Sequence, residues 1–229
     1  MTRKTNSRIA GFTFLFYIAV AFPSMVLFGR AASGDGMAAK LLGLARHATD
    51  VRVSVVLALL GCFSALVLAV TLYAITRDQD PDLALLAMTC RVAEGVAGAV
   101  SIPLTLGLLW LATATGADAP EPAAAQALGA FLLKGTPNVS ATFFAVGSTL
   151  FSWLLLRGRM VPVWLAWLGV VGSALIAVGL PLQLAGFLTG PVTQFMWIPI
   201  AVFELVVAFW LMIKGAAMPP RLRPAGVAT

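Results

Sequence analysis

Six apolar runs, each near the length at which an α-helix crosses a lipid bilayer, decide what this chain can fold into. A helix rises about 1.5 Å per residue, so about 20 residues span the roughly 30 Å of hydrocarbon. Helices are expected because open strands would leave backbone polar groups unpaired in lipid. The sequence predicts an all-α, polytopic transmembrane bundle, a single membrane domain over residues 1–229, with spans at 9–28, 51–76, 83–112, 139–156, 161–184 and 192–213.

Composition favours a membrane protein over a soluble one. The chain is 60% hydrophobic and only 10% charged, whereas soluble domains are close to half apolar and about a quarter charged. The first apolar run follows a basic segment, Met1–Arg8. This run is long enough to cross the membrane and has no clear small-residue cleavage site after it. We therefore interpret it as a retained span and not as a signal peptide.

The basic residues predict the orientation of the bundle. The net charge of +6 does not indicate nucleic acid, because the cations lie mainly at the ends of apolar runs and no basic, aromatic-rich segment is present. Nine of the 15 Lys and Arg residues lie on the side of the N-terminus, five lie on the other side, and Arg91 lies inside the third run. Because Lys and Arg accumulate in cytoplasmic loops, both termini are predicted to be cytoplasmic. The tryptophans near the ends of the runs fit the same orientation, as interfacial belts do.

Two connections on the outer side are too long for simple turns. The segments Met37–His47 and Pro120–Leu133 carry apolar residues at helical spacing. Both are predicted to be short helices lying on the outer leaflet. A lid over a cavity is the alternative interpretation of these segments.

Three charged residues inside the predicted spans are the first candidates for function, because charges in hydrocarbon are costly. Arg91 and Glu94 lie three apart in the third run, on one helix face. Glu204 lies in the sixth run. From the helical rise, Glu94 is about 18 Å from the start of its span and Glu204 about 15 Å from the end of its own, so both carboxyls are expected at similar depth. Arg91 would bridge them if the third and sixth spans are neighbours.

The charge count of this cluster leaves two interpretations open. One guanidinium cannot fully offset two buried carboxylates, so one carboxyl is expected to stay protonated unless water or a cation enters the site. The cluster is then either a polar clasp that holds two helices together or a proton or solute site.

Other polar residues give weaker signals. A polar outer vestibule is a further hypothesis, although hydrogen bonds between helices explain the same residues. No metal site is predicted, since His47 is the only histidine and lacks nearby partners. Cys62 and Cys90 lie in apolar runs and are interpreted as small buried hydrophobic residues. No Gly-rich phosphate loop, CxxC or GxSxG motif is present, so no catalytic residue and no cofactor is assigned. The vestibule candidates are Asn138, Ser140, Gln183 and Gln194.

Four short motifs, in order along nearly the whole chain, resemble a family of bacterial membrane proteins grouped as domain of unknown function 4386. The resemblance implies a six-helix protein of the bacterial cytoplasmic (inner) membrane and carries no catalytic assignment. Members of that family often have a histidine at the opening of the fourth span, where this chain has Asn138 and Val139. A site that needed that histidine would therefore be missing here. The motifs are Arg8-Ile9-Ala10-Gly11, Arg91-Val92-Ala93-Glu94, Val161-Pro162-Val163-Trp164-Leu165, and Glu204-Leu205 with Trp210-Leu211 and Lys214-Gly215.

The sequence leaves three functions open. The first is a non-catalytic binding, sensory or assembly subunit, with membrane lipids and a membrane protein or a second copy as partners. The second is a small proton- or solute-coupled carrier that uses the Arg/Glu cluster, although the internal repeat common in such carriers is not evident. The third, an intramembrane enzyme acting on lipids, lacks metal ligands and a nucleophile–base pair. We expect the first, with no enzymatic activity assigned.

Overall fold

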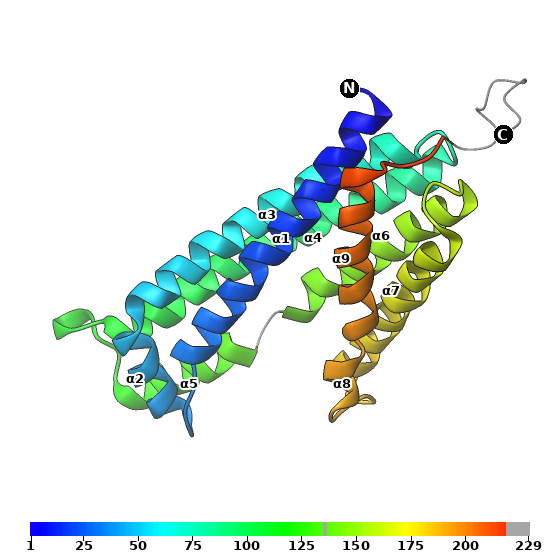
Figure 1. The fold of residues 1–229 in the computed structure, drawn as a ribbon. Helices are drawn as coiled ribbons and strands as arrows, with labels where there is room; N and C mark the ends of the chain where they lie inside the picture. The colour runs from blue at the N-terminus through cyan, green and yellow to red at the C-terminus, as the bar shows by residue number, and fades with distance from the viewer. Residues whose placement is uncertain (135–136, 219–229) are drawn as a thin grey trace, which may run out of the picture. The chain divides into compact units, whose positions relative to one another are not determined.

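The computed structural model describes residues 1–134 and 137–218, and that part of the chain consists of helices joined by turns and loops, with no strand (Figure 1). One short 3-10 turn, Gly116–Asp118, stands among the α-helices. The helices are α1 (Arg3–Ala31), α2 (Met37–Arg46), α3 (Ala48–Thr76), α4 (Pro81–Thr113), α5 (Pro122–Lys134), α6 (Pro137–Arg157), α7 (Val163–Leu184), α8 (Val192–Phe195) and α9 (Ile198–Ile213).

Six helical segments are long and apolar enough to cross a membrane, and they coincide with the six predicted runs. The sixth, Val192–Ile213, is not one continuous helix, because α8 ends at Phe195 and α9 begins at Ile198. Pro199 in the first turn of α9 fits this break, because proline has no N–H with which to continue the hydrogen bonds of α8 into α9. The prediction of six membrane-length helices is confirmed.

The chain divides into two compact units, and the boundaries between them fall inside α1, α3 and α4 and at the start of α6. The first unit consists of Met1–Phe16, Ser64–Glu94 and Asn138–Thr229. Its core is one cluster of apolar side chains, drawn mainly from α1, α3, α4, α6, α7 and α9. Helices α7 and α9 pack directly on each other. Their contact depends on small residues, because a Cβ atom placed on Gly169 would lie 2.6 Å from the ring of Phe203.

Helix α1 approaches α9 just as closely within this unit. A Cβ atom on Gly11 would lie 2.5 Å from the carbonyl oxygen of Ala208 and 2.7 Å from Cγ of Met212. Only a glycine allows the two backbones to come this near, as at other close helix crossings in membranes. The glycine of the segment Arg8–Gly11 thus has a packing role.

The second unit consists of Tyr17–Phe63 and Gly95–Pro137. Its core is small, with Ala31, Leu44, Val51, Leu108 and Leu109 buried together. Helices α2 and α5, at the two segments for which short helices were predicted, contact each other in this unit. That both segments are helical is confirmed, and their placement at the outer leaflet stays a prediction.

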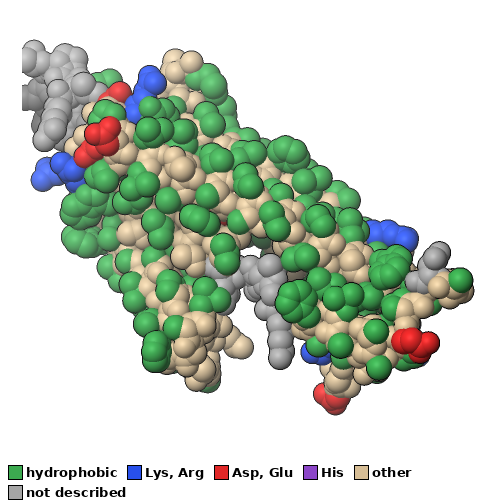
Figure 2. Space-filling view, turned by 180° about the vertical axis from the view of Figure 1, so that it is seen from behind, with side chains coloured by type: hydrophobic (Ala, Val, Ile, Leu, Met, Phe, Trp, Pro, Cys, Tyr) green, Lys and Arg blue, Asp and Glu red, His purple; other side chains and the backbone are tan. Residues whose placement is uncertain are grey.

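The outer surfaces of the helices are more apolar than those of a soluble protein. Figure 2 shows hydrophobic side chains over most of the visible helical surface, with Lys, Arg, Asp and Glu gathered toward the ends of helices. Large apolar side chains such as Phe12, Phe22, Val70, Trp164 and Val178 are exposed along the membrane-length helices. Contiguous apolar surface of this extent marks contact with lipid or a partner. The chain is a multi-pass membrane protein.

Candidate functional site

Arg91 and Glu94 form an ion pair inside the first unit. They lie one turn apart on α4, where helix geometry places side chains three residues apart side by side. Nη1 of Arg91 is 2.8 Å from Oε2 of Glu94, and the two side chains are 1% and 4% exposed. A buried charge of either sign is costly unless it is paired. The pairing that the spacing predicted is therefore present, in a setting that water does not reach.

Two aromatic rings enclose the guanidinium of Arg91. Its Cζ atom lies 5.1 Å from the ring centre of Phe144 on α6 and 6.0 Å from that of Phe14 on α1. Both are cation–π distances. Nε and Nη2 of Arg91 have no hydrogen-bond partner within the described part of the chain. The rings thus supply the stabilisation that hydrogen bonds would otherwise give.

Helix α6 is fitted to the ion pair at two further points. The hydroxyl of Ser140 donates a hydrogen bond of 2.9 Å to the backbone carbonyl of Glu94. A Cβ atom on Gly147 would lie 3.1 Å from Cγ of Arg91, so the glycine leaves room for the arginine stem. These contacts connect α6 to the turn of α4 that carries the charges.

Glu204 lies near this pair but is not part of it. Its side chain is on α9, it is 7% exposed, and the charges of Arg91 and Glu94 both act on it. Among the residues that the structure describes, no ion pair joins Arg91 with Glu204, and Oε1 of Glu204 has no hydrogen-bond partner. Of the two bridges expected from the sequence, Arg91 forms the one to Glu94. The second carboxyl is left alone in the protein interior.

A small pocket of about 10 Å³ lies in the same unit. That volume is about the minimum that one water molecule needs and is far below that of sites for drug-sized ligands. Arg91, Glu94 and Glu204 are not among its lining residues, although Phe14 lines both the pocket and the guanidinium. We call it the serine pocket, because its only polar lining residues are two serines. Its lining consists of Phe14, Leu72, Ser148, Phe151, Ser152, Leu155, Phe203, Val207 and Leu211.

The four residues of the predicted vestibule have different surroundings. The hydroxyl of Ser140 is used in the bond to Glu94. Gln183 is half-buried in α7 and Gln194 is exposed in α8. The side chain of Asn138 lies outside the described residues. The vestibule thus stays a prediction.

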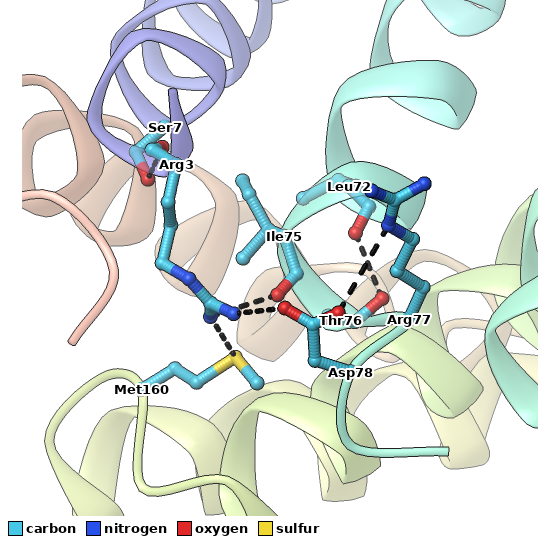
Figure 3. Close-up of polar contacts among 8 residues, drawn as sticks. All are labelled: Arg3, Ser7, Leu72, Ile75, Thr76, Arg77, Asp78 and Met160. Atoms are coloured by element: carbon cyan, nitrogen blue, oxygen red, sulfur yellow. Dashed lines mark hydrogen bonds and ion pairs between the residues drawn. The ribbon is translucent and has the colours of Figure 1, made fainter. Parts of the chain in front are cut away.

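A second polar cluster, which the sequence did not indicate, joins the start of α1 to the end of α3 (Figure 3). Arg3 donates through Nη1 to the carbonyl of Ile75 at 2.9 Å and pairs through Nη2 with Asp78 at 2.7 Å. Nη1 also lies 3.7 Å from the sulfur of Met160, in the turn between α6 and α7. Arg3 was foreseen only as one of the cations that set orientation. Its partners are more than 70 residues away, and no local pattern points to them.

The segment after α9 is attached to the same end of the first unit. The backbone N–H of Ala216 donates to Oγ of Ser7 at 3.1 Å, and that of Ala217 donates to the carbonyl of Met160 at 2.9 Å. Gly215 allows the chain to turn there, since its φ of 76° is left-handed backbone that favours glycine after a helix.

The chain was compared with known families and proteins. The model of the family described as Domain of unknown function (DUF4386) matches residues 9–215. The chain belongs to this family. No curated protein and no solved structure matched it. The resemblance inferred from four short motifs is thereby confirmed.

The DUF4386 match includes Arg91, Glu94 and Glu204 and leaves out Arg3 and Ser7 at the start of α1. Within the described residues of this DUF4386 protein, neither Cys62 nor Cys90 forms a disulfide. Within residues 1–134 and 137–218, no group of three or more His, Cys, Asp or Glu side chains is placed to hold a metal ion.

Proposed function

We propose that this DUF4386 protein is a non-catalytic subunit of the bacterial cytoplasmic membrane, with both termini in the cytoplasm. It would act as a binding, sensory or assembly component alongside a membrane protein partner or a second copy. In this proposal the Arg91–Glu94 pair is a structural clasp. The observation that carries the proposal is the complete enclosure of Arg91 between Phe14 and Phe144.

Enclosure argues against a role of this pair in chemistry or transport. A substrate must reach the groups that act on it, whereas the side chains of Arg91 and Glu94 are 1% and 4% exposed. The serine pocket is lined by neither residue. The pair instead contacts α1 and α6 through the two rings and the Ser140 hydrogen bond. The pair thereby fixes the positions of α1, α4 and α6 relative to one another within the first unit.

A proton- or solute-coupled carrier is the alternative. Glu204 favours it, because a buried carboxyl without a partner is typical of groups that gain and lose protons within membranes. The two functions differ in what crosses the bilayer: a carrier moves protons or solute through it, and a subunit does not.

The test is a flux measurement joined to a measurement of assembly. The purified chain is reconstituted into liposomes that enclose a pH-sensitive dye, and a pH gradient and a potential are applied. We expect the rate of internal pH change to equal that of protein-free liposomes. Native mass spectrometry of the protein, extracted at its natural expression level, is expected to show a stoichiometric second membrane subunit or a second copy. Proton flux abolished by Glu204→Gln, from a protein that is monomeric, would overturn the proposal in favour of the carrier.

A further inference from the structure

The charged centre of the first unit holds one cation and two carboxyls. Arg91 is engaged with Glu94 at 2.8 Å, and each of these two groups compensates the other. The other charges on the helices packed near α9 lie toward helix ends: Arg3, Lys4 and Arg8 at the start of α1 and Arg157 in the last turn of α6, while α7, which packs on α9, carries none. No further cation is therefore placed on these helices to neutralise Glu204.

Glu204 is buried to a degree that makes a bare carboxylate unfavourable. Oε1 is fully enclosed and has no hydrogen-bond partner among the residues of the described chain. An ionised carboxylate in such surroundings costs several kcal/mol even after the protein relaxes. A neutral carboxylic acid avoids most of that cost. The geometry thus favours a bound proton on this residue.

The serine pocket lies on the same face of α9 as Glu204. Val207 and Leu211 line the pocket and follow Glu204 by three and seven residues, which is the spacing of one helix face. They lead from Glu204 toward the end of α9, where Lys214 follows. That end also holds the turn after α6, because Ala217 bonds to Met160. The pocket therefore lies between the level of Glu204 and a polar end of the unit.

Two serine hydroxyls face this path from α6. Ser148 and Ser152 are one turn apart and are 8% and 1% exposed. Both line the pocket and are the two polar residues of its lining. Two hydroxyls on successive turns of an otherwise apolar pocket with room for about one water molecule are suited to bind that water and to pass a proton.

We propose that Glu204 is a proton-binding site and that the serine pocket carries the proton between Glu204 and the end of the unit at Arg157 and Lys214. The charged groups that act on Glu204 are Arg91 and Glu94 from α4. A site that binds and releases a proton suits a sensor of pH and does not require transport. This proton site is distinct from the clasp, because the clasp consists of Arg91 and Glu94, whereas the proton site is the carboxyl of Glu204.

The first experiment identifies the protonated carboxyl in the intact protein. Wild-type protein in detergent is treated with dicyclohexylcarbodiimide, an apolar reagent that reacts with protonated carboxylic acids, and the adduct is located by tandem mass spectrometry. We expect the label on Glu204 and its loss in Glu204→Gln, with Glu94 unlabelled. Labelling of Glu94 with Glu204 untouched would overturn the assignment, and so would no label on either residue.

The second experiment tests the path. Infrared spectra of the wild-type protein should contain the C=O band of a buried carboxylic acid, and this band should move to lower frequency after transfer to D₂O. We expect the shift to be severalfold slower in Ser148→Ala/Ser152→Ala, with Ser101→Ala, whose hydroxyl bonds within its own helix, as the control. An unchanged rate in the double variant would remove the serine pocket from the proposal. A band that persists in Glu204→Gln would remove Glu204. Neither result depends on whether the liposomes show proton flux.

Discussion

Replacing the two members of the clasp singly and together should give strongly non-additive losses of stability. The variants are Arg91→Met, Glu94→Met and the double variant, in which chains of similar volume replace both charges. Removing one partner of a buried ion pair costs about 3–5 kcal/mol, because the other charge stays buried alone. Replacing both with apolar residues is close to neutral. The structure supports the upper part of that range for Glu94→Met, because Arg91 is fully buried and cannot give up its proton.

Arg91→Met should cost less than Glu94→Met, although it also removes two cation–π contacts, each of about 0.5–2 kcal/mol. The stranded carboxyl can be protonated, and a stranded guanidinium cannot lose its proton. The coupling energy of the cycle should be at least about 3 kcal/mol.

Equilibrium unfolding in mixed detergent micelles, followed by tryptophan fluorescence, measures each free energy of unfolding. The control is Arg157→Met, which breaks the half-exposed pair with Asp80 at 3.4 Å and should cost about 0–1 kcal/mol. If the double variant loses as much as the two single variants combined, the pair is not a unit and the reasoning is wrong.

Three further predictions use the same unfolding assay. Gly11→Ala should destabilise the protein by about 1–3 kcal/mol, because its Cβ would meet the backbone of α9. The control is Gly29→Ala in the same helix, whose Cβ meets nothing within 4 Å and which should be neutral or stabilising. Equal effects of the two substitutions would contradict the packing role of Gly11. Ser140→Ala removes a bond between helices and should cost about 0.6–1.5 kcal/mol, and no loss would show that the bond is not made. Arg3→Ala should lower the free energy of unfolding by about 1–3 kcal/mol, and by less at high salt. Lys4→Ala, at an exposed position, should change it little. Equal losses in the two variants would refute the anchoring role of Arg3.

The membrane-length helices could be predicted because their cause is local. An apolar run of about 20 residues has one stable conformation in lipid, whatever surrounds it. The short helices α2 and α5 followed from local spacing too. The break at Met196 and Trp197 did not, because a proline inside an apolar run is compatible with a kinked helix as well as with an interrupted one.

The candidate site was predictable only as far as one helix extends. Arg91 and Glu94 are three residues apart, so their contact follows from helix geometry. The rings of Phe14 and Phe144 are supplied by other helices, and nothing in the sequence distinguishes them from other phenylalanines. The isolation of Glu204 also depends on where three helices place their side chains. Such facts belong to tertiary packing and not to pattern.

The close crossing of Gly11 with Ala208 and Met212 has a consequence for how the protein is made. Helix α1 leaves the ribosome nearly 200 residues before α9, which is roughly 10–40 s at ordinary elongation rates. During that interval its glycine face has no partner from its own chain and lies open to lipid or to the insertion machinery. Assembly of the first unit is therefore a late event in biogenesis. If translation slowed or stalled after α7, α1 would be inserted in the bilayer without its packing partner α9. Membrane quality-control proteases could then recognise this incomplete state.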